Sequence, residues 1–345
     1  MLLTTDAVGG VWRYSLDLAA GMVQRPILVV LGPSPSPLQR DEAAALGLQL
    51  IDTGLPLDWT AADPAALTAV TTALKDLAAG QGVRSVHLHA PALAGPDQWE
   101  PATVVVAHSC VATWWEAVRG GPLPGDLAWR AEATRVGLHT ADAIIAPSKA
   151  HADATCRAYG DCVITTVHNG SLFPMTEEGR ERGDSTGPIL TAGRLWDEAK
   201  NATALDQVAS QLDTSIHAAG PVAGPNGAHI HLPNLHLLGS LDARAMRRTY
   251  AEASVFASLA RYEPFGLSVL EAAQSGLRLV LSDIPTFREL WDGAARFVPL
   301  DADPVPALRA ALADTGDATR HAARYTVDKT VAGTLAVHRR LGAYA

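Results

Sequence analysis

Two glutamates, Glu263 and Glu271, stand in a stretch of sequence whose residue types suit the binding of a phosphorylated sugar. An apolar run at residues 255–260 predicts a buried strand just before Glu263, and a helical pattern at 267–275 places Glu271 near the start of a helix. The first N–H groups of a helix lack partners inside it and attract phosphate groups. Carboxylates accept hydrogen bonds from sugar hydroxyls. The stretch therefore indicates a nucleotide-sugar site.

The spacing of the two glutamates is weak evidence by itself, because a chain with 36 acidic residues contains such pairs by chance. The surrounding residues carry the interpretation. Pro264 and Gly266 predict a loop after the buried strand, and Gly276 is the residue type favoured just past the end of a helix. The alternative interpretation of Glu271 is an ordinary solvated glutamate on a helix.

A second motif lies between residues 191 and 201. A predicted strand ends at Gly193, Arg194 follows it directly, and Lys200 stands at the entrance of the next predicted helix. Two cations and a helix N-terminus at the carboxyl end of a strand can clamp a pyrophosphate. Taken alone, the same residues are also explained by an exposed arginine and lysine on a loop.

The first half of the chain offers two weaker candidates at predicted strand ends. Gly9 and Gly10 follow the first strand, and because glycine has no side chain, the backbone there can approach a ligand closely. The helix that follows directs the positive end of its dipole toward the same ligand. The spacing is not a dinucleotide fingerprint, and a tight turn without a ligand is the alternative. His108 follows the predicted strand 103–107.

Other histidines and tryptophans in this half are less informative. Trp114 and Trp115 come after His108, and aromatic faces stack on sugars, although indoles are equally common in protein cores. A lone histidine is usually structural. We interpret four further histidines in that way: His87, His89, His139 and His168.

Short apolar runs alternate with helical patterns along most of the chain, which predicts parallel sheets covered by helices on both faces. Strands are expected at 2–5, 27–31, 48–51, 83–87, 103–107, 143–146, 163–167, 189–192, 215–219, 235–238, 254–257 and 278–281. Helices are expected at 64–79, 201–212, 242–252, 267–275, 284–291, 305–312 and 327–341. Ser148 is expected only to cap a helix.

A polar stretch at 171–187 interrupts this alternation and is the best candidate for a linker. We therefore predict two doubly wound α/β domains, residues 1–172 and 173–326. Such domains bind ligands at the carboxyl ends of their strands, so a cleft between the two is the expected site.

Bulk properties exclude several classes of protein. Lys plus Arg number 27 against 36 for Asp plus Glu, a formal charge of −9 that argues against nucleic-acid binding. Three irregularly spaced cysteines form neither a disulfide framework nor a zinc site and favour the cytoplasm. No apolar run approaches the roughly 20 residues of a membrane span, and the N-terminus lacks the features of a signal peptide.

The stretch 260–276 resembles the paired-glutamate signature of retaining GT-B glycosyltransferases of family 4, and the similarity extends over most of the chain. The resemblance implies a GT-B fold, two Rossmann-like domains facing across a cleft, with the C-terminal helix 327–345 packed back on the first domain. It also implies transfer of a hexosyl unit from a nucleoside-diphosphate sugar to an acceptor hydroxyl by front-side substitution, with retention of configuration. No cofactor and no metal are expected, since no Asp-x-Asp motif stands near these positions.

The resemblance also implies roles for the donor-side residues. Arg194 and Lys200 would bind the donor diphosphate and stabilise its departure. Glu263 would contact hydroxyls of the transferred sugar, and Glu271 the nucleotide ribose. Backbone near the sugar and phosphate would come from Phe265, Gly266 and Leu267. Gly239 and the Gly220-Pro221 pair would lie near the base, and a plain turn is the alternative for each.

On the acceptor side, Gly9 and Gly10 would lie beside the diphosphate and the acceptor, His108 near the reacting sugar, and Trp114 and Trp115 against the acceptor. Acidic residues interleave with the arginines there, which favours a soluble small molecule or saccharide as acceptor. One departure from the family is Ser171-Leu172, where an apolar residue and an acid are usual.

Three other readings remain open from sequence alone. A GT-B sugar-nucleotide epimerase or hydrolase would use the same diphosphate clamp without an acceptor. A non-catalytic nucleotide-sugar binding module would be expected to have lost Glu263 or Arg194, and both are present. A nicotinamide dehydrogenase is also doubly wound, but the missing fingerprint counts against it.

Overall fold

The computed structural model describes residues 1–160, 162–172, 187–316 and 318–343. The chain divides into two compact units: unit 1 is Met1–Gly170 with Thr326–Ala345, and unit 2 is Ser171–Tyr325. From sequence we expect the boundaries after residues 172 and 326. The expected linker at 171–187 lies, for the most part, outside the described residues.

Within the described residues, unit 1 contains a seven-stranded sheet in the order β3-β2-β1-β4-β5-β6-β7, and all neighbouring strands are parallel. The order reverses between β1 and β4, which is the arrangement of a doubly wound sheet. The strands are β1 (Leu2–Asp6), β2 (Ile27–Leu31), β3 (Leu50–Asp52), β4 (Ser85–Leu88), β5 (Ala102–Val106), β6 (Ala143–Ala146) and β7 (Ile164–Thr166).

Helices cover both faces of this sheet, as alternate side chains of β5 show. Val105 packs in one core with Leu74 and Leu138, and Val104 packs in another with Val337 of the last helix. The helical elements of unit 1 are α1 (Gly10–Ala20), α2 (Pro37–Ala45), α3 (Pro64–Gly80), η1 (Pro91–Ala94), α4 (Val111–Val118), α5 (Gly125–Thr140), α6 (Lys149–Tyr159) and α13 (Val327–Arg340).

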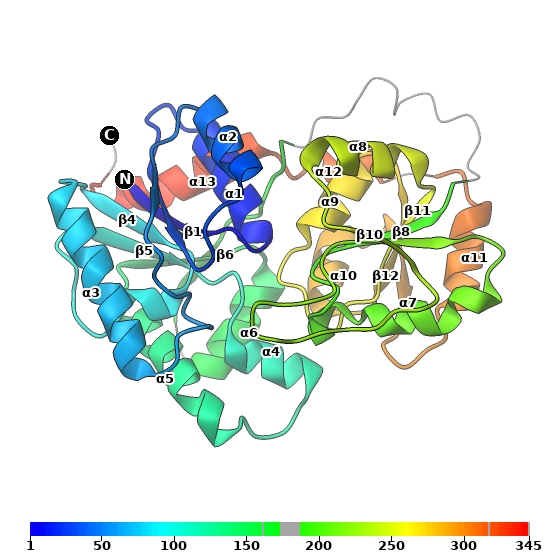
Figure 1. The fold of residues 1–345 in the computed structure, drawn as a ribbon, viewed down its shortest axis with the longest axis horizontal. Helices are drawn as coiled ribbons and strands as arrows, with labels where there is room; N and C mark the ends of the chain where they lie inside the picture. The colour runs from blue at the N-terminus through cyan, green and yellow to red at the C-terminus, as the bar shows by residue number, and fades with distance from the viewer. Residues whose placement is uncertain (161, 173–186, 317, 344–345) are drawn as a thin grey trace. The chain divides into compact units, whose positions relative to one another are not determined.

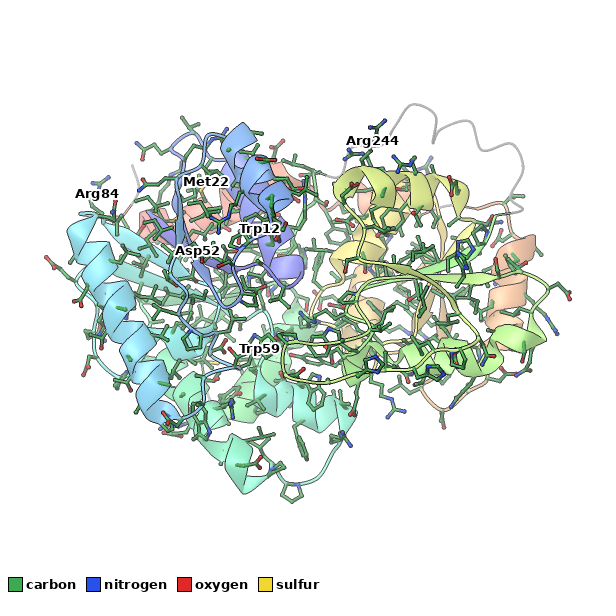
Figure 2. The ribbon with its side chains drawn as sticks, in the orientation of Figure 1. Trp12, Met22, Asp52, Trp59, Arg84 and Arg244 are labelled. Carbon is green, nitrogen blue, oxygen red and sulfur yellow. The ribbon has the colours of Figure 1, made fainter. Side chains whose placement is uncertain are left out.

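The C-terminal helix α13 belongs to unit 1 and contacts both α1 and β5 (red beside blue in Figure 1). The contact is close: a Cβ on Gly21, just after α1, would lie 2.6 Å from Val331 Cγ2. Trp12, labelled in Figure 2, lies on the other side of α1. Its Nε1 donates a hydrogen bond to Glu42 of α2 over 3.2 Å. α1 is therefore held between α13 and α2.

Unit 2 repeats the doubly wound plan. Its described residues form a six-stranded parallel sheet in the order β10-β9-β8-β11-β12-β13, which reverses between β8 and β11. The strands are β8 (Ile189–Ala192), β9 (Ile216–Ala219), β10 (His236–Gly239), β11 (Val255–Ser258), β12 (Arg278–Ser282) and β13 (Ala295–Val298).

Both faces of this second sheet are also buried. Phe256 packs with Leu270 of α9 and Phe287 of α10, whereas its neighbour Val255 packs with Leu205 of α7 and Leu308 of α11. The helical elements are η3 (Glu198–Lys200), α7 (Ala202–Val208), η4 (Ala209–Gln211), α8 (Ala243–Glu252), α9 (Leu267–Gln274), α10 (Pro285–Trp291), α11 (Val305–Ala313) and α12 (Thr319–Ala322).

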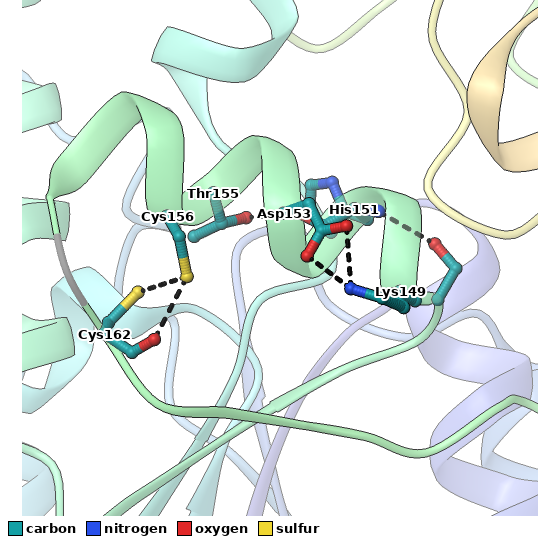
Figure 3. Close-up of polar contacts among 7 residues, drawn as sticks. Lys149, His151, Asp153, Thr155, Cys156 and Cys162 are labelled. Atoms are coloured by element: carbon teal, nitrogen blue, oxygen red, sulfur yellow. Dashed lines mark hydrogen bonds and ion pairs between the residues drawn. The ribbon is translucent and has the colours of Figure 1, made fainter.

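Local sequence explains where the helices begin. Asp63, Ser148 and Asp242 each cap a helix by accepting a hydrogen bond from the backbone N–H three residues later, as small polar side chains do at this position. In α6, which Ser148 caps, Lys149 pairs with Asp153 one turn on (Figure 3). The sulfur of Cys156 in the same helix lies 3.0 Å from that of Cys162, which follows the helix, and both are free thiols. The cap at Ser148 agrees with the sequence prediction.

Three details differ from expectation. Strand β13 is not predicted, because only Val298 among its residues is buried and the edge strand lacks an apolar run. The helix expected at 201–212 is split into α7 and the short 3₁₀ turn η4. Helix α3 includes Gly80 and is capped by Gln81 rather than ending before the glycine.

Among the described helices, none is both long and apolar enough to cross a membrane.

Helix α5 contains a glycine whose replacement should separate packing from helix propensity. A Cβ on Gly137 would lie 1.8 Å from the carbonyl oxygen of Pro91 in η1, so α5 meets η1 backbone to backbone. Gly137→Ala should lower the free energy of unfolding by roughly 1–3 kcal/mol, although alanine is the better helix former. Calorimetric unfolding measures the change.

The matched control is Gly80→Ala, at a helical glycine with nothing within 4 Å of the added carbon. It should be neutral or stabilise by up to about 1 kcal/mol. Equal effects of the two substitutions would contradict the proposed backbone contact.

Candidate functional site

Several of the sequence-predicted site residues follow strands at the reversal of strand order in each sheet, or next to it. In unit 2 the loops after β8 and β11 carry Arg194, Lys200 and Glu263. In unit 1 the loop after β1 carries Gly9, and His108 follows β5. At a reversal, consecutive loops leave toward opposite faces of the sheet and open a crevice at the carboxyl ends of the strands. Each unit therefore presents part of the predicted set.

Arg194 follows the first glycine after β8 and is held by its own loop. Its Nη2 donates to Asp197 Oδ2 over 3.2 Å, and Asp197 also accepts a hydrogen bond from the Ala199 amide at 3.0 Å. Arg194 Nε is buried, and within the described residues it has no hydrogen-bond partner. A buried guanidinium donor without a partner is unfavourable unless a ligand satisfies it.

Lys200 and Glu263 join the two predicted motifs. Lys200 Nζ donates to Glu263 Oε2 over 2.5 Å, and the two side chains are only 21% and 13% exposed. Glu263 Oε1 lies 3.5 Å from the backbone amide of Phe265. An ammonium group has three donors, and one of them is directed to Glu263. The loop after β8 and the loop after β11 thus meet through a partly buried ion pair.

Backbone contacts hold these two loops together. The Arg261 amide donates to the Ala199 carbonyl over 2.8 Å, and Asn201 Nδ2 donates to the Leu259 carbonyl over 3.0 Å. Asn201 adopts the left-handed conformation, with φ of 51°, which asparagine tolerates better than most residues. The ion pair is therefore placed by main chain and not only by flexible side chains.

Glycines line the neighbouring strand ends of unit 2. A Cβ on Gly220, after β9, would lie 1.8 Å from the Gly193 carbonyl oxygen after β8, so only glycine fits there. The Gly220 amide donates to the carbonyl of Gly239, the last residue of β10, over 2.8 Å. The three glycines bring bare backbone to adjacent strand ends.

Helix α9 begins at the predicted position. Its N-cap, Gly266, has φ of 89°, a conformation that favours glycine. The Phe265 ring is buried against Tyr325, with ring centroids 5.7 Å apart, so Phe265 offers a ligand its backbone and not its ring. Leu267 is the first helical residue, and the first-turn N–H groups of α9 lie next to Glu263 in the chain.

Glu271 is half-buried and held by two hydroxyls that sequence reasoning missed. Ser171 Oγ donates to Glu271 Oε1 over 3.4 Å, and Tyr250 Oη lies within donating distance of both Glu271 Oε2, at 3.3 Å, and the Ser268 carbonyl oxygen, at 3.2 Å. Burial, and then the charge of Glu271, raises the pKa of the Tyr250 phenol, which therefore stays protonated and donates. Ser171 is the position where the chain departs from the family pattern. No sequence signal marks Tyr250, a single aromatic residue in α8.

In unit 1, the loop after β1 leads directly into α1. Asp6 Oδ1 accepts a hydrogen bond from the Val8 amide over 2.8 Å, which shapes the turn, and Gly9 is the N-cap of α1. Gly10 is the first helical residue and is exposed. The first turn of α1 contains no acidic residue. No carboxylate in that turn therefore neutralises the partial positive charge at the N-terminus of the helix.

His108 follows β5 and is half-buried among aromatic rings. Its Nε2 lies 2.8 Å from His89 Nδ1, and its ring packs edge-on against Tyr14, with centroids 4.8 Å apart. Burial, followed by the nearby His151, lowers the pKa of His108 to about 3. The imidazole is therefore neutral at physiological pH.

His108 ends a row of four histidines, His338, His87, His89 and His108, which we call the histidine row. His338 Nε2 of α13 lies 3.1 Å from His87 Nδ1, and the His87 and His89 rings pack edge-on at 5.2 Å. His89, which we interpret from sequence as structural, contacts the candidate site residue His108. The His-x-His spacing at the end of β4 was the available signal, since alternate strand residues share a face.

Trp114 and Trp115 both lie in α4, with ring centroids 6.4 Å apart, and neither is fully buried. Their expected contact with an acceptor stays a prediction. Within the described residues, no three His, Cys, Asp or Glu side chains gather as metal ligands would.

Two family models match the chain. The model described as glycosyltransferase family 4 matches residues 8–171, and the model described as glycosyl transferases group 1 matches residues 187–315. Each match falls almost entirely within one of the two units. A search of curated proteins finds no match.

Solved structures of glycosyltransferases share the fold of the chain. Sucrose-phosphate synthase from Thermosynechococcus elongatus matches with a TM-score of 0.76 at 16% identity over 99% of this chain and 100% of that one. A glycosyltransferase from Rickettsia africae gives 0.70 at 13% identity over 98% and 97% of the two chains. Anabaena HepE, solved in complex with UDP and glucose, gives 0.69 at 14% identity over 97% and 99%.

The Lys200–Glu263 ion pair should couple more strongly than an exposed pair. A double-mutant cycle with Lys200→Met and Glu263→Gln should give a coupling energy of about 1 kcal/mol or more in unfolding experiments, because both side chains are mostly buried. The matched control is Lys149→Met with Asp153→Asn, whose side chains are 73% and 52% exposed. That pair should couple by less than about 0.5 kcal/mol. Equal coupling in the two cycles would contradict the described geometry.

Proposed function

Because the chain belongs to the group 1 glycosyltransferases of family 4 and has the GT-B fold, we propose that it transfers a hexosyl unit from a nucleoside-diphosphate sugar to an acceptor hydroxyl with retention of configuration. The observation that carries the proposal is the contact of Lys200 with Glu263. It places a cation suited to phosphate beside a carboxylate suited to sugar hydroxyls. A site with both groups in contact is what the phosphate-to-sugar junction of such a donor requires.

Arg194, Lys200 and the start of α9 bind the donor diphosphate in this proposal. The buried Arg194 Nε supplies a donor that the described residues leave unused, and Lys200 retains donors beyond the one given to Glu263. The first-turn N–H groups of α9 add partial positive charge. These groups stabilise the negative charge that develops on the diphosphate as it departs.

Glu271 binds the nucleotide ribose. Its carboxylate oxygens accept hydrogen bonds from Ser171 and Tyr250, and a carboxylate is the kind of acceptor that a ribose hydroxyl needs. The two hydroxyls thus orient the carboxylate. Gly220 and Gly239, at the adjacent strand ends, let backbone approach the base.

The reaction is a front-side substitution. The acceptor oxygen forms a bond to the anomeric carbon on the face from which the bond to the phosphate oxygen breaks, and the acceptor proton passes to the departing phosphate. His108 near the reacting sugar is a poor general base, because burial lowers its pKa to about 3. Proton removal by the leaving group accords with that low basicity.

The remaining elements of the proposal concern the surroundings of the reaction. Gly9 and Gly10 lie beside the diphosphate and the acceptor, and Trp114 and Trp115 contact a soluble small-molecule or saccharide acceptor. Arg194 and Lys200 supply the positive charge, so no divalent metal and no cofactor take part. The three free cysteines suit a reducing cytoplasm.

Nucleotide binding tests the donor site directly. Calorimetry with UDP, GDP, ADP and TDP, without metal, should reveal clear binding of one diphosphate, and UDP is tested first because HepE holds it. Glu271→Ala should weaken that binding on the order of 10- to 100-fold, since a charged hydrogen-bond acceptor is lost.

The control is Glu252→Ala, an exposed glutamate on a helix of the same unit, which should bind the nucleotide like wild type. If no diphosphate binds, or if both substitutions weaken binding equally, the donor-site assignment fails.

The stereochemical course tests the reaction itself. With the cognate donor and excess EDTA, the anomeric proton coupling of the new glycoside should match that of the donor, which indicates retention without a metal. A product with inverted configuration would refute retention. Activity only with added divalent ion would refute metal independence. Donor consumed at full rate without any acceptor would instead indicate an epimerase or hydrolase.

A further inference from the structure

We propose that His89 is a positioning residue that holds His108 as the tautomer protonated on Nε2, so that His108 offers the bare Nδ1 lone pair to a ligand hydroxyl. The network consists of Thr5, Ser15, His89 and His108, which we call the tautomer network. It lies entirely within unit 1. Only the identity of the ligand, a sugar, rests on the proposed function.

The direction of the hydrogen bonds follows from counting protons at Ser15. Ser15 Oγ lies 2.8 Å from the Val11 carbonyl oxygen, 2.9 Å from Thr5 Oγ1 and 3.1 Å from His89 Nε2. Each of these contacts needs a proton between its two atoms, and Ser15 has one. A carbonyl can supply none, so Ser15 donates to Val11. With that proton used, Ser15 accepts at its other contacts: His89 donates to it, and Thr5 donates across the 2.9 Å contact rather than to the Asp6 carbonyl oxygen 3.5 Å away.

The same count fixes the next bond in the network. A neutral imidazole has one N–H, and His89 uses it at Nε2 to reach Ser15, which leaves His89 Nδ1 as an acceptor. His89 Nδ1 lies 2.8 Å from His108 Nε2. The proton in this contact must come from His108, which is thereby protonated on Nε2 and bare on Nδ1.

The count holds if both rings are neutral, and their surroundings keep them so. Burial, then the neighbouring His108, lowers the pKa of His89 well below its ordinary value. Burial also lowers the pKa of His108, to about 3. No carboxylate is hydrogen-bonded to either ring among the described residues, so no anion favours the imidazolium form.

Backbone anchors both ends of the network. The His89 amide donates to Thr4 Oγ1 over 2.9 Å, which ties the residue after β4 to β1. Ser15 and Val11 are one turn apart in α1, the helix that begins at Gly10. The tautomer of His108 is thus set by contacts with β1 and α1. The loop between these two elements carries Gly9.

The consequence for recognition is chemical selectivity. His108 Nδ1 has no hydrogen-bond partner in the part of the chain that the structure describes, so it is available to a ligand. A bare nitrogen accepts a hydrogen bond from a hydroxyl but repels an unprotonated phosphate oxygen. His108 therefore recognises a sugar hydroxyl and does not help to bind the diphosphate.

Nuclear magnetic resonance tests the tautomer without any substrate. In long-range proton–nitrogen correlation spectra of the histidine-labelled protein, His108 Nε2 should show the shift of a protonated nitrogen and Nδ1 that of a bare one. His108→Gln identifies these signals by removing them. An Nδ1-protonated His108, or an even mixture of tautomers, would overturn the proposal.

Two variants of His89 separate positioning from structure. In His89→Asn, the amide oxygen replaces Nδ1 as the acceptor for His108, so the tautomer should persist and kcat/KM should stay near wild type. In His89→Gln, the amide nitrogen replaces Nε2 but the acceptor is lost. The tautomers should then mix and kcat/KM should fall on the order of tenfold. His139→Gln, at an exposed histidine, should change neither readout.

Equal loss of activity in His89→Asn and His89→Gln, with the His108 signals unchanged in both, would show a merely structural role and refute positioning. Failure of the proposed function is distinguishable from this result. If the spectra show the expected tautomer but no sugar nucleotide is consumed, the network stands and the glycosyl transfer does not.

Discussion

The site of unit 2 depends on the reversal of strand order at which β8 and β11 become neighbours. Parallel pairing of these strands starts both from the same level of the sheet, so that their following loops emerge side by side. Main-chain bonds then join the loops, through the Arg261 amide and the Ala199 carbonyl among others. Opposite charges on Lys200 and Glu263 are brought into contact as a result. The sequence separates these two side chains widely, and only the reversal unites them.

Unit 1 also has a reversal of strand order, but the residues that follow its strands are of different types. β1 and β4 meet at its reversal, and the residues that follow them are a glycine turn and a buried histidine. Cations are concentrated at the strand ends of unit 2, whereas neutral imidazoles, uncharged because they are buried together, line those of unit 1. In the proposed function, the cations of unit 2 bind the anionic diphosphate and the imidazoles of unit 1 bind sugar hydroxyls.

The sequence is informative where a pattern is local. Strand β8, the start of α9 and the caps at Asp63 and Ser148 follow from short runs and single polar residues, and the paired-glutamate stretch leads to the correct family. Features that depend on the fold were not accessible. Ser171 reaches Glu271 from a hundred residues away, and His89 matters only because of what stands beside it. Strand β13 was missed because an edge strand needs little apolar character. The expected linker lies largely outside the described residues.

Helix α13 returns the end of the chain to unit 1, so the whole of unit 2 is inserted between two segments of its neighbour. During synthesis, unit 2 is contiguous and can complete its core as soon as Tyr325 has emerged. Unit 1 must wait for the last helix, because Val337 closes one face of its sheet and His338 covers His87. The half of the protein that is made first is therefore the half that is finished last.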